Sequence, residues 1–389
     1  DANTTANYNI GIGYNALTSE ASGERNVAIG HASLEDSNGG SYNTAIGYGT
    51  LRNNTTADNN TAIGYEALVA NTSGTKNTAV GYQALDANTT ATGNNAFGSQ
   101  SLSGNTTGAS NNAVGNQALF TNTTGSNNTA IGHVALGDNS TGSNNTAVGY
   151  FALNANTASN NTAVGFQSGN SNTSGTNNVF LGYQTGYPNT TGGENVGVGR
   201  NSLGSNLTGN YNVAMGSQAL AYNTTSSNTA IGRRASFSNT TGTLNTTVGT
   251  DAGYDVTTGS YNTLVGYNSG GQITTGSKNT IIGRYNGNSG GLDLRTSSNN
   301  IVLSDGDGNI RMYIDSSGNV LVGKTTTSSS TAGVNIAPSG TIFAARDSDY
   351  VANLNRETND GTIIQFAQDD VTEGTISVSG TTASYNGGH

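Results

Sequence analysis

The sequence predicts an all-β protein, a parallel β-roll or β-solenoid of about 17 coils of about 17 residues each, and three observations lead there. First, the pattern Asn-x-x-apolar-Gly recurs with its glycine at every 17th residue from Gly13 to Gly283, apart from two steps of 16. Second, only 32% of the residues are hydrophobic and 9% are charged, which is too little for a globular core, so a thin core must continue from one repeat to the next. Third, glycine and asparagine every few residues exclude helices.

The glycine that closes each pattern is called the repeat glycine below. The residue before it is apolar in all seventeen copies, and the residue four before it is Asn in all seventeen. We expect the apolar residue to form the core, and the asparagines to bond backbone groups and to stack as an amide ladder. The structural repeat core of the first four copies is therefore predicted at Asn9, Ile12, Gly13, Asn26, Ile29, Gly30, Asn43, Ile46, Gly47, Asn60, Ile63 and Gly64.

The rest of the repeat has a second apolar position and a polar turn. Four residues after the repeat glycine stands Leu in eleven copies, whereas five later copies have Gly there: Gly169, Gly186, Gly253, Gly270 and Gly287. We expect those coils to lose part of their core and to depend more on partner chains. The residue two before the repeat glycine is mostly small, which predicts a tight approach to another backbone. Each coil is expected to contain one β segment of five residues.

The Asn-x-Ala-Ile/Val-Gly repeat, over residues 8–287, resembles the head repeats of trimeric autotransporter adhesins. That resemblance implies a left-handed β-roll in an intertwined homotrimer displayed outside the cell. A homotrimer also follows from the thinness of each coil, because three rolls can bury one face each around a common axis.

Beyond the repeats the composition changes, and the predicted organisation is a repeat region at 1–287, a linker at 288–298, a β-hairpin neck at 299–324 and a small β-rich domain at 325–389. Asp-Gly and Gly-Asn turns separate short alternating strands in the neck. The segments 314–323 and 354–366 resemble the part of phage tail fibres that precedes a self-cleaving intramolecular chaperone. That resemblance implies a chain ending at His389 after the chaperone is released.

Composition argues against several classes of function. The net charge is −10 and no basic patch exists, so neither nucleic acid nor an anionic membrane is an expected partner. No apolar run approaches 18 residues, so no membrane insertion is expected. The chain has no cysteine, and no cofactor or metal is expected. The run 305–309 begins like a calcium loop, but Ile310 and Ser316 stand where Gly and Glu are required, so it is interpreted as a hairpin turn.

The residue after the repeat glycine is often aromatic, and it is His31 or His133 in two copies. Six repeats separate these histidines, so they cannot share a metal ion. The tyrosines of this position favour packing between chains, with a carbohydrate-stacking surface as the alternative. Asp369, Asp370 and Glu373 are interpreted as a solvated turn rather than a pair of catalytic carboxylates, and the chain is not expected to be an enzyme.

Together these features predict a structural protein, an extended homotrimeric tail fibre of a bacteriophage. It would attach the virion tail, outside the cell, to a carbohydrate or protein receptor of the host surface. Two alternatives remain open at this point. One is an adhesin or appendage subunit on a bacterial cell surface, and the other is a tailspike that degrades polysaccharide.

Overall fold

The computed structural model describes residues 7–346, 351–352, 354, 361–368, 371–379 and 381–387. Every regular element among them is a β-strand, and the prediction of an all-β chain is confirmed. The chain divides into two compact units, Asp1–Arg311 and Met312–His389, which are described separately. Two calls fall on residues outside the described ranges: the turn at Asp369 and Asp370, and the chain end at His389.

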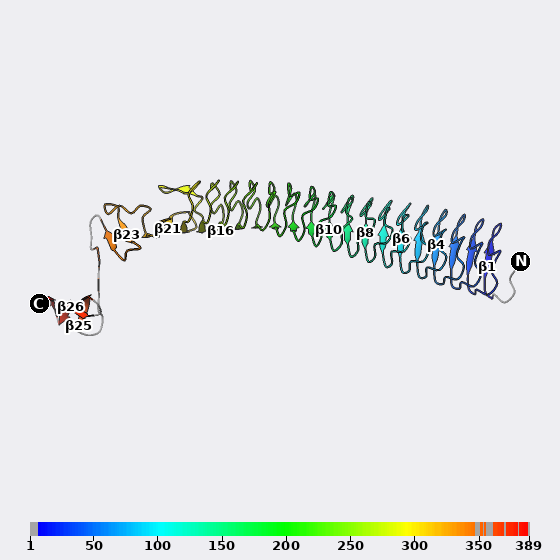
Figure 1. Cartoon of the computed structure of the whole chain (residues 1–389), viewed down its shortest axis with the longest axis horizontal. Coiled ribbons are helices and arrows are strands. Elements are labelled where there is room, and N and C mark those ends of the chain that lie inside the picture. Colours follow the sequence, from blue (N-terminus) through cyan, green and yellow to red (C-terminus); the bar gives the residue numbers. More distant parts are fainter. Residues whose placement is uncertain are drawn as a thin grey trace. The chain divides into compact units, whose positions relative to one another are not determined.

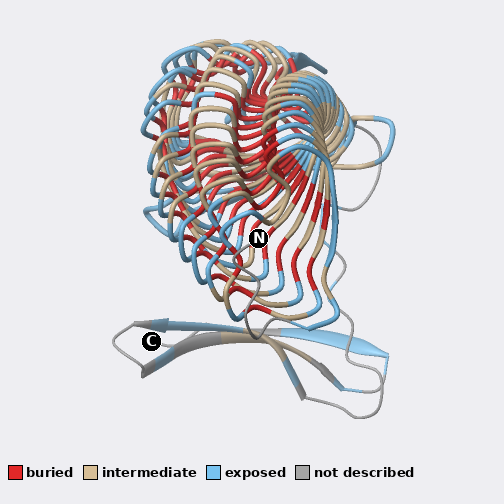
Figure 2. Ribbon diagram, turned by 90° about the vertical axis from the view of Figure 1, so that its right-hand side faces the viewer, coloured by how far each residue is buried: buried red, intermediate tan, exposed pale blue. Residues whose placement is uncertain are grey.

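The first unit is a parallel β-solenoid (Figure 1). One strand of three residues occurs in each repeat, where the sequence predicted five, and each strand pairs parallel and in register with the next, as Ala28 does with Ala45. The seventeen strands are β1 Ile10–Ile12, β2 Val27–Ile29, β3 Thr44–Ile46, β4 Thr61–Ile63, β5 Thr78–Val80, β6 Asn95–Phe97, β7 Asn112–Val114, β8 Thr129–Ile131, β9 Thr146–Val148, β10 Thr162–Val164, β11 Val179–Leu181, β12 Val196–Val198, β13 Val213–Met215, β14 Thr229–Ile231, β15 Thr246–Val248, β16 Thr263–Val265 and β17 Thr280–Ile282. Viewed along the stack, each coil is rotated slightly relative to its neighbour (Figure 2).

The interior of each coil is not built from the residues that the sequence predicted. The middle residue of each strand points inward, and Ala28, Ala45 and Ala62 are fully buried. The apolar residue before the repeat glycine faces outward instead, so that Ile12 is 59% exposed and Ile63 is 37% exposed. Because side chains alternate across a strand, the small residue and the large one must lie on opposite faces. The prediction that Ile12, Ile29, Ile46 and Ile63 fill the core of the chain is therefore wrong, and the small residue approaches the interior of its own coil.

The second apolar position lies inside, as expected. Leu34, Leu51 and Leu68 have no exposed surface and lie in the same core cluster as the strand alanines. These leucines have positive φ angles of 49–55°, a left-handed conformation that turns the chain sharply. Glycine adopts this conformation without strain, so Gly169, Gly186, Gly253 and Gly270 fit the same backbone corner at φ 57–60°, whereas Gly287 differs with a φ of 103°.

The later coils keep a filled core beside these glycines, so the prediction that they lose part of it is wrong. Phe180 takes the inward strand position of β11 and is fully buried. A Cβ added to Gly169 or Gly186 would come within 2.7 Å of its ring. Leu264 fills the corresponding space beside Gly253 and Gly270 in the same way. The volume missing at the corner is thus supplied from the strand.

The repeat glycine itself is required by two independent constraints. Its φ lies between 111° and 140° in every coil, a region that residues with a side chain rarely adopt. It also touches the next coil, since a Cβ on Gly64 would lie 2.3 Å from the carbonyl oxygen of Gly81. Any side chain here would push adjacent coils apart.

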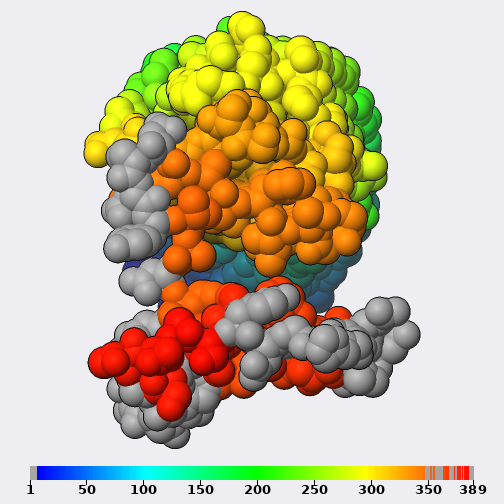
Figure 3. Space-filling model, turned by 90° about the vertical axis from the view of Figure 1, so that its left-hand side faces the viewer, coloured from blue at the N-terminus to red at the C-terminus, as the bar shows by residue number. Residues whose placement is uncertain are grey.

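The solenoid extends beyond the last repeat that the sequence revealed. Strand β20, Ile301–Ser304, pairs parallel with β17, so residues 284–300 form one further, longer coil. Within the segment predicted as a linker, β18 Asn288–Ser289 and β19 Leu292–Asp293 make a small antiparallel hairpin. Tyr285 is fully buried beneath it, and its hydroxyl donates to the carbonyl oxygen of Leu292 at 2.7 Å. The residues of these last coils, in yellow, form a packed surface (Figure 3).

The second unit contains two antiparallel sheets. One is a meander of β21 Ile310–Ile314, β22 Val320–Val322, β23 Gly333–Ile336 and β24 Ile342–Ala345, which begins in the last residues of the first unit. The other has β25 Gly361–Gln368, β26 Val371–Ser379 and β27 Thr382–Gly387. The turns between strands in the predicted neck 299–324 fall at the Asp-Gly and Gly-Asn signals, since Asp315 accepts hydrogen bonds from the backbone of Ser317 and Asn319.

Candidate interaction surfaces

A ladder of buried asparagines connects each coil to the next. The Oδ1 atom of Asn26 accepts the backbone N–H of Asn43 at 2.9 Å, and Asn43 does the same for Asn60. The Nδ2 atom of Asn26 donates to the carbonyl of Gly40 at 2.7 Å. The predicted amide ladder is therefore confirmed, although it runs mostly from side chain to backbone. Asn26, Asn43 and Asn60 are fully buried, whereas Asn9 in the first coil is partly exposed.

A second ladder of buried asparagines was missed from the sequence. It lies seven residues after the repeat glycine in twelve consecutive coils, within the segment interpreted as a polar turn. Asn71 donates to the Oδ1 of Asn54 at 2.8 Å, and Asn88 donates to that of Asn71 at 2.9 Å. The signal was present, because a solvent-exposed turn does not require one residue type at a constant spacing. The members are Asn54, Asn71, Asn88, Asn105, Asn122, Asn139, Asn156, Asn172, Asn189, Asn206, Asn223 and Asn239.

The two ladders share acceptors. The carbonyl oxygen of Gly74 accepts Nδ2 of Asn60 from the first ladder at 2.9 Å and Nδ2 of Asn71 from the second at 3.0 Å. Hydrogen-bonded amides tolerate burial, whereas an unpaired one costs about 1–3 kcal/mol. The ladders therefore hold the polar side of every coil in a single arrangement, and their role is structural.

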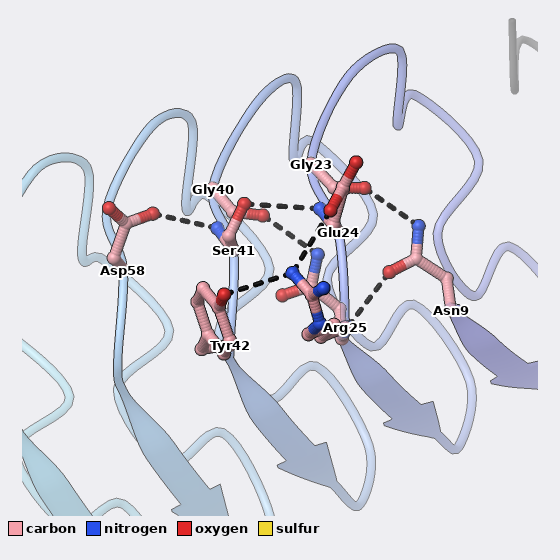
Figure 4. A network of polar contacts seen from close by, with 9 residues as sticks. Asn9, Gly23, Glu24, Arg25, Gly40, Ser41, Tyr42 and Asp58 are labelled. Atoms are coloured by element: carbon pink, nitrogen blue, oxygen red, sulfur yellow. Dashed lines mark hydrogen bonds and ion pairs between the residues drawn. The ribbon is translucent and has the colours of Figure 1, made fainter. Parts of the chain in front are cut away.

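The first coils also carry a charged network on their surface (Figure 4). Asp58 accepts the backbone N–H of Ser41 at 2.7 Å, and the Ser41 hydroxyl accepts that of Glu24 at 3.1 Å. The Arg25 guanidinium lies 5.4 Å from the ring centre of Tyr8 and 5.3 Å from that of Tyr42, between the two rings. Exposed contacts of this kind contribute little to stability.

An apolar stripe runs along the outer face of the stacked strands. It consists of the residue before each repeat glycine, together with Leu303 of β20, and none of these eighteen side chains is buried. Phe97 is 43% exposed in the middle of the stripe. A continuous apolar stripe on a polar surface is typical of a protein interface. The other members are Ile12, Ile29, Ile46, Ile63, Val80, Val114, Ile131, Val148, Val164, Leu181, Val198, Met215, Ile231, Val248, Val265 and Ile282.

A ring column stands beside this stripe, formed by the residues that follow the repeat glycines. Its first run, from Tyr14 to Tyr82, stacks five rings in successive coils with centres 5.0–5.5 Å apart: Tyr14, His31, Tyr48, Tyr65 and Tyr82. Its second run stacks four rings at 5.2–5.4 Å: His133, Tyr150, Phe166 and Tyr183. His31 and His133 are thus members of aromatic stacks, in the position where the sequence placed them.

In the acidic turn after β20, the carboxylate oxygens of Asp305 accept hydrogen bonds from neighbouring residues of the same turn. Asp305 accepts the side-chain and backbone N–H groups of Asn309 and pairs with the guanidinium of Arg311, whose Nε lies 2.9 Å from its Oδ2. The side-chain hydrogen bond from Asn309 is the main reason that the pKa of Asp305 falls to about 2. A guanidinium thus takes the place that a cation would need. Among the described residues, no cluster of three or more His, Cys, Asp or Glu side chains could hold a metal ion.

Comparison with known proteins gives no relative. No family model, no curated protein and no solved structure matches this chain. In the part of the chain that the structure describes, no helix is long and apolar enough to cross a membrane. The fold and surface define the chain as a β-solenoid repeat protein, and its function rests on what these surfaces can contact.

Proposed function

We propose that this chain forms the shaft of an extended homotrimeric fibre, and that the fibre is a bacteriophage tail fibre that attaches the virion to a host-cell surface. One observation carries the proposal: the apolar stripe is unbroken over eighteen coils although most of the surface around it is polar. Selection for solubility alone would not keep an apolar side chain at every one of these positions.

The geometry of the stripe favours chains that wind about one another. Successive coils are rotated (Figure 2), so the stripe turns around the solenoid instead of lying along one flat side. A partner that covers all of it must follow the same twist, as an identical chain does. Three chains around one axis can each cover the stripe of a neighbour within a closed assembly. Seventeen steps of strand spacing give a shaft of about 80 Å, a length suited to holding a receptor-binding end away from a particle.

The oligomer is tested by measuring mass in solution. Sedimentation equilibrium of the full chain should give three times the chain mass of 39.2 kDa, and the double variant Ile63→Asp/Ile131→Asp should dissociate it because two charges enter each buried stripe. Leu207→Asp is the matched control, since Leu207 is 48% exposed and lies outside the stripe. A wild-type monomer at micromolar concentration would overturn the trimer.

The attachment role needs a separate test. Antibodies against the solenoid should label tail fibres of virions in electron micrographs, and the neighbouring genes should encode tail and baseplate proteins. A downstream membrane-anchor domain would instead favour a bacterial surface adhesin. We propose a non-catalytic fibre, so incubation of the purified protein with host capsule should release no sugars; release would favour a polysaccharide-degrading tailspike.

A further inference from the structure

The ring column is interrupted for two coils. Between Tyr82 and His133 the position after the repeat glycine is held by Ser99 and Asn116, whose side chains are far smaller than a ring. The stack has four or five consecutive rings on either side. Since each ring occupies one coil step of about 4.8 Å, the interruption has the length of two missing rings.

The two rings that bound the interruption each have one face without an aromatic neighbour. Tyr82 is 50% exposed, whereas Tyr65 inside the same run is 44% exposed. Ring faces inside a run are covered by the next ring, so a ligand can reach only the faces at the ends of a run. Tyr82 and His133 therefore present two opposed faces, three coil steps or about 14 Å apart.

Neutral polar groups line the space between these faces. Asn116 Nδ2 lies 3.5 Å from the carbonyl oxygen of Ser99. The residues two after the repeat glycines form an adjacent column, in which Nε2 of Gln117 donates to Oε1 of Gln100 at 3.2 Å. That arrangement leaves Nε2 of Gln100 and Oε1 of Gln117 without a hydrogen bond to any described residue. No charged residue occupies the ring column or the adjacent column in the coils from Gly81 to Gly132.

We propose that this interruption, the ring gap, binds two consecutive pyranose units of a neutral oligosaccharide. The apolar C–H faces of the two sugars stack on Tyr82 and His133, and their hydroxyls bond the amides of Gln100, Gln117 and Asn116. An apolar surface with a few placed hydrogen-bonding groups is how proteins bind small ligands. Nucleobases could also stack, but their phosphates would approach a chain with a net charge of −10.

This site deepens the proposed function, because a fibre that attaches to a host meets a surface coated with polysaccharide. It also differs from the sequence-based interpretation that the tyrosines pack between chains. The apolar stripe supplies a surface for partner chains, and the ring gap lies in the neighbouring column, next to the stripe.

The sharpest test fills the gap. The variant Ser99→Tyr/Asn116→Tyr gives both coils the residue that other coils carry at this position, so the fold should be retained and the ring column completed. The matched control, Ser217→Tyr, adds a tyrosine at the same position of a distant coil. Probes are neutral oligosaccharide fragments of bacterial surface polysaccharides on a glycan array, followed by calorimetric titration of the wild-type ligands.

We expect wild type and Ser217→Tyr to bind the same neutral glycans and the filled variant to bind none. Tyr82→Ala and His133→Ala should each weaken binding about tenfold, the scale of one aromatic stacking contact. The proposal fails if wild type binds no neutral glycan, or if the filled variant binds as well as wild type. Fibre attachment is measured separately by adsorption to host cells, and adsorption that persists in the filled variant would leave the fibre role intact while removing this site.

Discussion

The early and late coils of the solenoid fill the same cross-section with different residues. From Gly30 to Gly149 each coil combines a strand alanine with a corner leucine, as Ala96 does with Leu102, and both are fully buried. From Gly165 onward the corner is glycine in five coils, and large strand residues such as Phe180 and Leu264 lie beside several of these glycines. The side-chain volume inside each coil stays about constant along the stack, although the residue that supplies this volume changes.

The exchange is possible because of the backbone at the corner. The corner residue has a φ of 48–60° both in the leucine coils and at Gly169, Gly186, Gly253 and Gly270, so replacing one residue type by the other leaves the coil path unchanged there. A third way to fill the interior of a coil uses polar residues. Ser236 stands at the corner of one late coil, and its hydroxyl forms a hydrogen bond with the inward-facing Thr247 of the next coil at 3.0 Å.

The largest effect is expected from removing the large strand residue that fills the interior of the late coils. Phe180→Ala should destabilise the surrounding coils by about 3–5 kcal/mol, because neither Gly169 nor Gly186 has a side chain to fill the cavity. The loss should be measured by amide hydrogen exchange in β10–β12, since a repeat stack opens locally rather than as one unit.

A rescue variant sharpens the same comparison. Gly169→Leu/Phe180→Ala/Gly186→Leu rebuilds the early composition in a late coil and should recover most of the lost protection. Failure of this variant to improve on Phe180→Ala would contradict the view that layer volume is what the stack preserves.

The next prediction concerns the second asparagine ladder, where one variant in the early coils should lower stability and one in the late coils should not. Asn122→Val removes the donor to Asn105 and the acceptor for Asn139, at a cost of about 1–3 kcal/mol. The ladder ends at Asn239, whose buried Oδ1 has no partner among the described residues and whose successor is Val256. Val256→Asn should therefore be neutral or stabilising, because it supplies that partner. Thermal unfolding followed by circular dichroism would compare the two variants, and equal losses in both would contradict the ladder account.

The smallest effect concerns the end of the stack, where a charged turn follows the last coil. The folded pKa of Asp305, about 2, lies below the usual value of about 3.9 for an unfolded Asp. The turn is therefore stabilised by the ionised carboxylate above about pH 4, and that contribution is lost as the pH falls toward 2. An NMR titration of the carboxyl should show the low midpoint in wild type and a higher one in Arg311→Met. A normal midpoint in wild type would contradict the hydrogen-bonded turn.

The periodicity of the sequence was sufficient to predict the solenoid, its seventeen regular repeats and the ladder through Asn26, Asn43 and Asn60. It did not reveal which face of the strand is buried. In most of the strands an alanine stands directly before a larger apolar residue, and both are apolar, so the hydrophobic pattern fits either orientation. The larger residue was assigned to the interior, whereas a coil this thin has room only for the smaller one.

The sequence, interpreted one repeat at a time, also did not reveal that a large residue in one coil fills the space left by glycines in that coil and the one before it. Each glycine at the corner was weighed within its own repeat, although Phe180 fills space beside glycines of two different coils. The eighteenth coil was missed because its period is lengthened from 17 to 21 residues, as the step from Asn279 to Asn300 shows. The ring gap is visible in the sequence only after the stacked rings on either side are known to be in contact.

The in-register stack has a genetic consequence. Because each coil meets its neighbours through the same atoms, with Asn bonding Asn and repeat glycine touching repeat glycine, removing or duplicating seventeen codons joins surfaces that already fit. Unequal recombination between repeats could then change the reach of the molecule in steps of about 4.8 Å without inventing a new contact. Length in such a protein is set by copy number, and a lineage can adjust it without redesigning any single repeat.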